Sequence, residues 1–291
     1  MLGIGDDAAI LNPNDIRQMV VSTDTLVADV HFKSSDQAAT IGHKSLAVNF
    51  SDIAAMGAKP KWVLLNLTLP EINKKWCNGF IKGFSQLITK HHAQLIGGDT
   101  TQGPLSITVT VLGETDKAIT RNTAKVDDLI VVSGELGSAA FALNNPRSNK
   151  ECNAQLHSPE PRLDVAEKIK HIATSMIDVS DGLLADLTHI CVASQVAAVV
   201  ELSQIPVNPA IKKDPNWKQY VLAGGDDYQL CFTINMENEV QLPEGCHIIG
   251  QILATEEESK IDVAEVMVLE NHQPIQTDFS NKQGYQHFNH E

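Results

Sequence analysis

Short apolar segments with two different periodicities alternate along the 291-residue chain, and this alternation restricts the fold more than any other feature. Residues 62–69 and 105–112 alternate between apolar and polar side chains with the period of two that marks a strand. Residues 76–88 instead place Phe80 and Phe84 on one face of a helix. The first half of the chain is therefore predicted to mix α and β structure.

Further elements of both kinds are predicted in the two halves of the chain. Further strands are expected at 20–23, 129–132, 176–179, 196–202, 228–234 and 247–253, and further helices at 35–56, 162–172 and 183–193. Residues 143–162 are rich in Asn, Pro, Ser and charged residues, which predicts a connection rather than a core element. The predicted fold class is α+β in two domains, residues 1–134 and residues 135–291, joined near Gly134.

The net charge restricts the partners of the chain. With 22 basic and 36 acidic residues the formal charge is −14, which argues against a nucleic acid or an anionic membrane as partner. If these carboxylates face a polyphosphate, divalent cations must lie between the two. Five scattered cysteines without a C-x-x-C pair predict neither a zinc site nor a disulfide framework. No basic leader or apolar run of about 20 residues is present, so we expect a cytoplasmic protein.

Aspartates beside glycine or hydroxyl residues recur at or near the ends of predicted elements. The five motifs are Gly5-Asp6-Asp7, Ser22-Thr23-Asp24, Gly97-Gly98-Asp99, Asp178-Val179-Ser180-Asp181-Gly182 and Gly224-Gly225-Asp226-Asp227. Each motif alone is typical of a turn. Together they favour a Mg²⁺ site fed by several loops, because so many carboxylates near one another repel unless cations compensate. Asp52 lies within an otherwise apolar helix, so we expect it to be partly buried with a partner.

The sequence supports neither of two common nucleotide-binding motifs, the dinucleotide fingerprint and the P-loop. Residues 3–8 match the G-x-G-x-x-A fingerprint, but no strand precedes them in this chain and residues 9–11 resemble a strand rather than a helix start. No G-x-x-x-x-G-K-[ST] sequence occurs, so a nucleotide is not held by a P-loop. Among the histidines, His31 is the best candidate for a binding site, because it follows the Ser22 to Asp24 motif. A structural role for His31 is an equal alternative.

The motifs, in their order and spacing, resemble one family over essentially the whole chain. The matching segments are residues 3–9, 22–26, 30–32, 42–58, 97–101, 177–183, 224–228 and 284–288. They resemble thiamine-monophosphate kinase, of the aminoimidazole ribonucleotide synthetase superfamily. The resemblance implies an N-terminal α/β domain that binds metal and ATP and dimerises, a C-terminal α+β domain, a homodimer, and ATP between the domains.

The resemblance also implies roles for individual residues. Metal contacts are expected from Asp7, Ser22, Thr23, Asp24, Asp52, Asp99, Asp178 and Asp181, and nucleotide contacts from Gly98, Asp99, Arg121 and Ser180. Thiamine monophosphate would be contacted by His31, Asp226 and Phe279. Of these residues, Asp24, Asp99 and Asp181 are expected to carry catalysis through Mg²⁺. The implied reaction is phosphorylation of thiamine monophosphate by ATP.

The chain departs from the family pattern at three places. Asp226 stands where the family usually has Glu, and Phe279 is the nearest match to a usual Trp. The chain also begins almost at its first motif, so we expect some loss of substrate cover or stability. Two alternatives stay open on the sequence: another ATP-dependent synthetase of the superfamily, and a nucleotide-binding protein without turnover.

Overall fold

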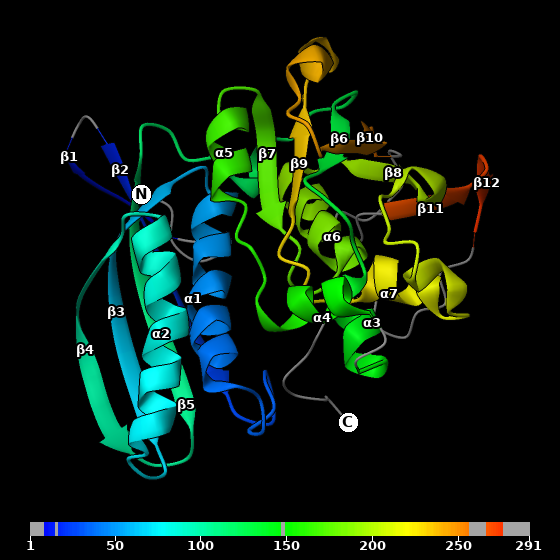
Figure 1. The fold of residues 1–291 in the computed structure, drawn as a ribbon. Helices are drawn as coiled ribbons and strands as arrows, with labels where there is room; N and C mark the ends of the chain where they lie inside the picture. The colour runs from blue at the N-terminus through cyan, green and yellow to red at the C-terminus, as the bar shows by residue number, and fades with distance from the viewer. Residues whose placement is uncertain (1–8, 15–16, 147–148, 256–265, 276–291) are drawn as a thin grey trace, which may run out of the picture. The chain divides into compact units, whose positions relative to one another are not determined.

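The computed structural model describes residues 9–14, 17–146, 149–255 and 266–275. The chain forms two compact units, and each is built from two stretches of sequence (Figure 1). The first unit contains Met1–Ala118 and His157–Leu163, and the second contains Ile119–Leu156 and Asp164–Glu291.

The division differs from the expected boundary after Gly134. The strand β6 (Leu129–Val132) pairs with β9 (Leu230–Ile234) and β10 (His247–Leu253), so it belongs to the second unit. The chain also returns to the first unit for a short segment, where the imidazole Nε2 of His43 lies 2.8 Å from the carbonyl oxygen of Pro159. These pairings join residues far apart in sequence, which local periodicity does not report.

A five-stranded sheet and two helices make up the first unit. The elements are β1 (Ala9–Asn14), β2 (Arg17–Val27), α1 (Ala38–Ala55), β3 (Lys59–Leu69), α2 (Lys74–Lys90), β4 (Gln94–Gln102) and β5 (Ser106–Thr115). The strand order is β1-β2-β5-β3-β4, antiparallel except for the parallel pair β3 and β4. Figure 1 shows α1 and α2 side by side over one face of this sheet.

The two helices differ in how they are covered. Most of α1 is buried, because it packs against both the sheet and α2, and its buried residues include polar ones such as Ser45 and Asn49. Helix α2 buries one face only, through Phe80, Gly83, Phe84 and Leu87. It begins where the Asn73 side chain accepts a hydrogen bond of 3.1 Å from the main-chain N–H of Trp76.

Glycine allows the close approach of α1 and α2. A Cβ atom on Gly83 would lie 1.8 Å from the carbonyl oxygen of Ala39, and one on Gly42 would lie 2.2 Å from the carbonyl oxygen of Phe80. Both distances are well inside van der Waals contact. The helix that carries Asp52 is therefore held against α2 at a spacing that only glycine permits.

We predict that Gly83→Ala destabilises the protein. In most helices this change stabilises by about 0.5–1 kcal/mol, but here the added methyl group overlaps α1, which typically costs about 1–3 kcal/mol. Urea unfolding followed by far-UV circular dichroism measures the difference. Ser85→Ala, on the exposed face of the same helix, is the control. Equal stability of the two variants would contradict the close-packing argument.

A seven-stranded sheet organises the second unit. Its order is β12-β11-β8-β10-β6-β9-β7, with β7 (Ala173–Asp178), β8 (Ala197–Glu201), β11 (Val266–Glu270) and β12 (Gln273–Pro274). The helices are α3 (Ser138–Asn144), α4 (Lys150–His157), α5 (Leu163–Ile169), α6 (Leu183–Ser194) and α7 (Trp217–Ala223). Helix α6 packs on β7, β9 and β11 through a core that includes Leu187, Ile190 and Val200.

Several sequence expectations are confirmed, and some need correction. β6 and β10 have the expected bounds, and α1, α2, α6, β3 and β5 lie close to theirs. The expected connection at 143–162 contains α4, which buries only Cys152 and Leu156. The Gly97-Gly98-Asp99 motif lies inside the strand β4 rather than in a loop at the end of an element.

Two further findings concern the cysteines and the length and hydropathy of the helices. All five cysteines are free. In the part of the chain that the structure describes, no helix combines the length and the apolar character needed to cross a membrane.

Candidate functional site

In the first unit, the side chains of Ser22, Asp24 and Asp52 come together. Alternate residues of a strand share a face, so Ser22 and Asp24 point from β2 to the same side, where α1 packs. The Ser22 hydroxyl donates a hydrogen bond to the Asp52 carboxylate. The Asp24 and Asp52 carboxylates also lie within hydrogen-bond distance of each other. The expected partial burial of Asp52 with a partner is therefore confirmed.

The electrostatics of this cluster oppose two ionised acids. Burial raises the pKa of Asp24 above its ordinary value, while the contact with Asp52 and the nearby His31 act in the lowering direction. Two carboxylates in contact are stable only with a proton or a cation between them. The imidazole Nδ1 of His31 accepts a 3.0 Å hydrogen bond from the Val27 N–H, so a neutral ring carries its proton on Nε2.

The donor set of this cluster fits Mg²⁺. It contains only hard oxygen atoms, one from a hydroxyl group and the others from two carboxylates, which are the ligands that Mg²⁺ prefers. Among the described residues, no three or more His, Cys, Asp or Glu side chains are grouped in a way that could hold a metal ion. A cation at Asp24 and Asp52 would therefore complete its coordination with water and substrate oxygen atoms, as Mg²⁺ commonly does.

Thr23 and Asp99 do not join this cluster. The Thr23 hydroxyl lies 2.8 Å from the Thr110 hydroxyl, on the other face of β2 from Asp24. The register places Gly98 in line with Asp24 across three strand spacings, a separation of about 14 Å, and Asp99 is the next residue. The expected metal contacts of Thr23 and Asp99 stay predictions.

Glycine is required at position 98. Its φ is +142°, and a Cβ atom there would lie 1.8 Å from the carbonyl oxygen of Leu65. Asp99 is exposed, and its carboxylate accepts a 2.8 Å hydrogen bond from the Thr100 N–H. The backbone at Gly98 and the carboxylate of Asp99 therefore both lie at the open edge of the sheet.

In the second unit, two motifs run side by side. After β7 the chain passes through Val179 and Ser180, whose carbonyl oxygens accept hydrogen bonds of 2.8 Å from the N–H groups of Tyr228 and Asp226 respectively. This pairing brings the segment 178–182 next to the segment 224–229. Asp178 is buried, whereas Asp181 and Asp226 are half-buried. The expected metal ligands Asp178 and Asp181, the nucleotide contact Ser180 and the substrate contact Asp226 thus belong to one pair of loops.

Two further residues, one in the first turn of α6 and one in the second loop, were not predicted from the sequence as part of a site. The Asp186 carboxylate accepts hydrogen bonds of 3.1 Å from the N–H groups of Asp181 and Gly182, which fixes the start of α6. The Tyr228 hydroxyl donates a 2.8 Å hydrogen bond to the Asp226 carboxylate. An acid in the first turn of a predicted helix could have pointed to Asp186. Tyr228 ends the segment 224–228 that resembles the family, but nothing in its residue type or spacing gave it a role.

Asp227 anchors the second loop from inside the unit. Its carboxylate is fully buried and accepts hydrogen bonds from the N–H groups of Gly137 (2.5 Å) and Ala139 (3.2 Å). Burial raises the pKa of Asp227 to about 7, although these N–H groups act in the lowering direction. Gln155 donates a further hydrogen bond of 2.6 Å to the Asp227 carbonyl oxygen. Asp227 is therefore a structural residue beside Asp226.

We predict that Asp227→Asn flattens the pH dependence of stability. The native state holds the proton up to about pH 7, whereas an ordinary aspartate loses it near 3.8. Between these values the native state binds more protons than the unfolded chain, so Asp227 makes the free energy of unfolding fall as pH rises. Asn keeps an oxygen acceptor and does not titrate.

Thermal unfolding of Asp227→Asn between pH 4.5 and 8 measures this effect. Asp127→Asn is the control, because Asp127 is exposed and lies at φ +72°, a conformation that Asn tolerates. The same pH slope in wild type and Asp227→Asn would show that Asp227 is ionised throughout.

Arg121 lies elsewhere in the second unit. Its carbonyl oxygen accepts hydrogen bonds from the Ser175 hydroxyl (3.0 Å) and the Ser194 hydroxyl (2.7 Å). Ser194 ends α6, roughly 16 Å along the helix from Leu183. The main chain of Arg121 is therefore at the opposite end of α6 from Ser180 and Asp181, and only an extended ligand would contact both ends.

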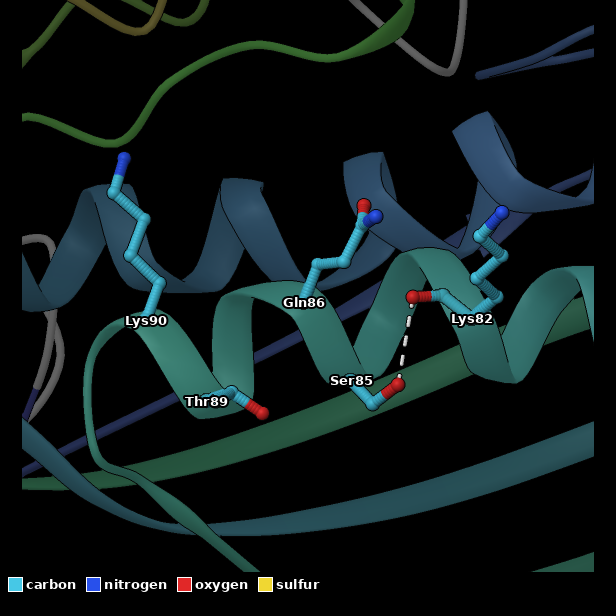
Figure 2. Close-up of a pocket in the computed structure, with 5 residues that line it drawn as sticks. All are labelled: Lys82, Ser85, Gln86, Thr89 and Lys90. Carbon is cyan, nitrogen blue, oxygen red and sulfur yellow. Dashed lines mark hydrogen bonds between the residues drawn. The ribbon is translucent and has the colours of Figure 1, made fainter.

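Asp7 and Phe279 lie outside the described residues, so their expected roles stay predictions. A shallow hollow elsewhere on the first unit is lined by side chains from the outer face of α2: Lys82, Ser85, Gln86, Thr89 and Lys90 (Figure 2). It contains none of the expected site residues, and its hydroxyl, amide and ammonium groups supply no carboxylate.

Comparisons with known proteins show the family of the chain. Residues 5–115 match the family model "AIR synthase related protein, N-terminal domain". Thiamine-monophosphate kinase of Escherichia coli (strain K12) is 36% identical over 99% of this chain and 92% of its own length. The enzyme of that name from Bacillus subtilis (strain 168) is 39% identical over 99% and 93%. The chain belongs to the thiamine-monophosphate kinase family.

Solved structures of this family share the fold. The thiamine-monophosphate kinase of Stenotrophomonas maltophilia K279a has a TM-score of 0.80 and 38% identity, covering 94% of this chain and 92% of that one. The structure "AaThiL complexed with AMPPCP and TMP" has a TM-score of 0.84 and 28% identity, covering 98% and 92%. The expected α+β fold of the thiamine-monophosphate kinase family is thereby confirmed.

Proposed function

We propose that the chain is a thiamine-monophosphate kinase, which transfers the γ-phosphoryl group of ATP to thiamine monophosphate and forms thiamine diphosphate. The observation that carries this proposal is the identity of 36–39% with kinases of that name over 99% of the chain. A relative of the same fold was solved with AMPPCP and TMP. Phosphoryl transfer from ATP needs Mg²⁺, and the carboxylates of the two units are the type of ligand that binds this ion.

The transfer requires alignment and charge compensation rather than proton removal. Phosphoryl transfer has a loose transition state, so positioning and electrostatics supply most of the catalysis. The acceptor is a phosphate monoester with a second pKa of about 6, so it is already largely ionised at pH 7. The aspartates are therefore assigned to metal binding and to orientation, and the phosphate oxygen attacks in line without a general base.

We assign Mg²⁺ to Asp24, Asp52 and Ser22 in the first unit, and to Asp178 and Asp181 in the second. Bound there, Mg²⁺ would neutralise phosphate charge and orient the phosphate oxygen atoms. The protein's own contribution is to hold the carboxylates in contact despite their repulsion. In the second unit, the Asp186 carboxylate fixes the main chain of Asp181.

Coupled ADP release with and without thiamine monophosphate tests the proposed function. A kinase releases ADP only when thiamine monophosphate and Mg²⁺ are both present. ADP release that needs a different acceptor would indicate another synthetase of the superfamily, and ATP binding without any turnover would indicate a sensor. Identification of thiamine diphosphate as the product completes the assay.

We predict that Asp24→Asn lowers turnover by orders of magnitude and leaves the fold intact. Asn keeps the shape of the side chain but removes the charge that would hold Mg²⁺ against the triphosphate, and such transition-state contacts typically contribute about 10²–10³-fold in kcat. Steady-state kinetics at saturating Mg²⁺ measure the loss. Asp116→Asn, at an exposed acid of the same unit, is the control. ATP binding that EDTA does not weaken would contradict the metal assignment.

We propose a homodimer in the cytoplasm. Every residue of the edge strand β4 is exposed, including Leu95 and Ile96 at 47% and 51%, and an uncovered strand edge favours pairing with a second chain. The free cysteines suit a reducing compartment.

We predict a sedimentation coefficient that corresponds to twice the chain mass of 31.6 kDa at micromolar concentration. Ile96→Lys should shift the protein towards the monomer, because a charge on an edge strand opposes pairing. Ile81→Lys, at an exposed apolar residue of α2, is the control. A wild-type protein that sediments only as a single chain would exclude the dimer.

A further inference from the structure

Asp226 and Tyr228 occupy an unusual backbone conformation. Their φ angles are +68° and +48°, in the left-handed region that residues other than glycine seldom adopt. Such a conformation costs free energy and persists only where the surroundings impose it, which occurs most often at functional sites. A bulky residue such as Tyr is especially disfavoured there, so a specific contact is expected to explain it.

The surroundings impose this conformation from both sides. The N–H groups of Asp226 and Tyr228 donate to the carbonyl oxygens of Ser180 and Val179, and the buried carboxylate of Asp227 holds the residue between them. A Cβ atom on Gly225 would lie 2.4 Å from the Ser180 carbonyl oxygen, so the two segments are in close contact. The Asp226 main chain is thereby fixed.

The Asp226 side chain needs a separate constraint, which Tyr228 supplies. The Tyr228 ring is buried at 8% exposure, and its hydroxyl lies 2.8 Å from Oδ1 of Asp226. We propose that Tyr228 is a positioning residue, which orients the Asp226 carboxylate towards the cationic ring of the substrate. This inference rests on the proposed function, because it takes thiamine monophosphate as the molecule that Asp226 contacts.

The chemistry of the partner determines which ligand Asp226 can select. A Lys or Arg at position 228 would orient the carboxylate but also neutralise it. A tyrosine hydroxyl is an uncharged donor near pH 7, so it fixes the direction of the carboxylate and leaves its negative charge for the ligand. The geometry therefore favours a substrate that presents a positive charge at this loop, as a thiazolium ring does, over a neutral analogue of the same shape.

Steady-state kinetics of Tyr228→Phe, with each substrate varied separately, test the proposal. We expect the KM for thiamine monophosphate to rise by roughly tenfold or more, because a hydrogen bond to a charged group is lost. The KM for ATP and the unfolding temperature should stay near their wild-type values. The control is Tyr220→Phe, since Tyr220 is an equally buried ring of the same unit that packs edge-on against Phe141. It should leave both KM values unchanged.

A double-mutant cycle separates positioning from a general structural role. Asp226→Ala alone should raise the KM for thiamine monophosphate and leave that for ATP unchanged. Adding Tyr228→Phe to Asp226→Ala should then cause no further rise, since Tyr228 would act only through Asp226. Independent, additive effects of the two substitutions would overturn the proposal.

Other outcomes also decide the question. A Tyr228→Phe protein with an unchanged KM for thiamine monophosphate, with equal rises for both substrates, or without a folded state would overturn the positioning role alone, provided that the wild type is active. A wild-type protein that releases no ADP in response to thiamine monophosphate would overturn the proposed function, and the positioning role with it.

Discussion

The contact between the Asp24 and Asp52 carboxylates is the constraint on which the first unit depends. Two unit charges at 4 Å repel by about 4 kcal/mol at the effective dielectric near a protein surface. Packing of α1 against both the sheet and α2 keeps the pair together, and the glycines at the helix interface make that packing close. The apolar packing of α1 thus stabilises two carboxylates, Asp24 and Asp52, that repel each other when no cation or proton lies between them.

The second unit arranges its acids by a different principle. Asp186 and Asp227 accept main-chain hydrogen bonds and hold the loops, whereas Asp178, Asp181 and Asp226 are the residues to which we assign ligand contacts as a proposal. Burial raises the pKa of Asp227 to about 7, so this residue carries only part of its charge at neutral pH. The reduced charge of Asp227 limits repulsion beside the neighbouring Asp226, the proposed substrate contact.

Sequence reasoning succeeded where a local pattern determines the structure. β6 and β10 are short apolar strands, and their observed bounds equal the predicted ones. β4 was missed because its residues are polar, glycine or exposed, so no alternation is visible. α4 was missed because it buries only two side chains. Strand periodicity places Ser22 and Asp24 on one face, but their contact with Asp52 arises from tertiary packing, as does the pairing of segments 178–182 and 224–229.

The aspartate at position 226 differs in reach and in orientation from the glutamate that the family usually carries there. An added methylene group would move the carboxylate by about 1.5 Å, and this displacement is large compared with the tolerance of a 2.8 Å hydrogen bond. A glutamate at this position would therefore gain reach towards the proposed substrate and lose the hydrogen bond by which Tyr228 orients the shorter side chain. The shorter acid loses less conformational entropy when it is fixed, since it has one rotatable bond fewer. In this chain, selectivity for a cationic ring would thus depend on a well-oriented acid rather than on a long one.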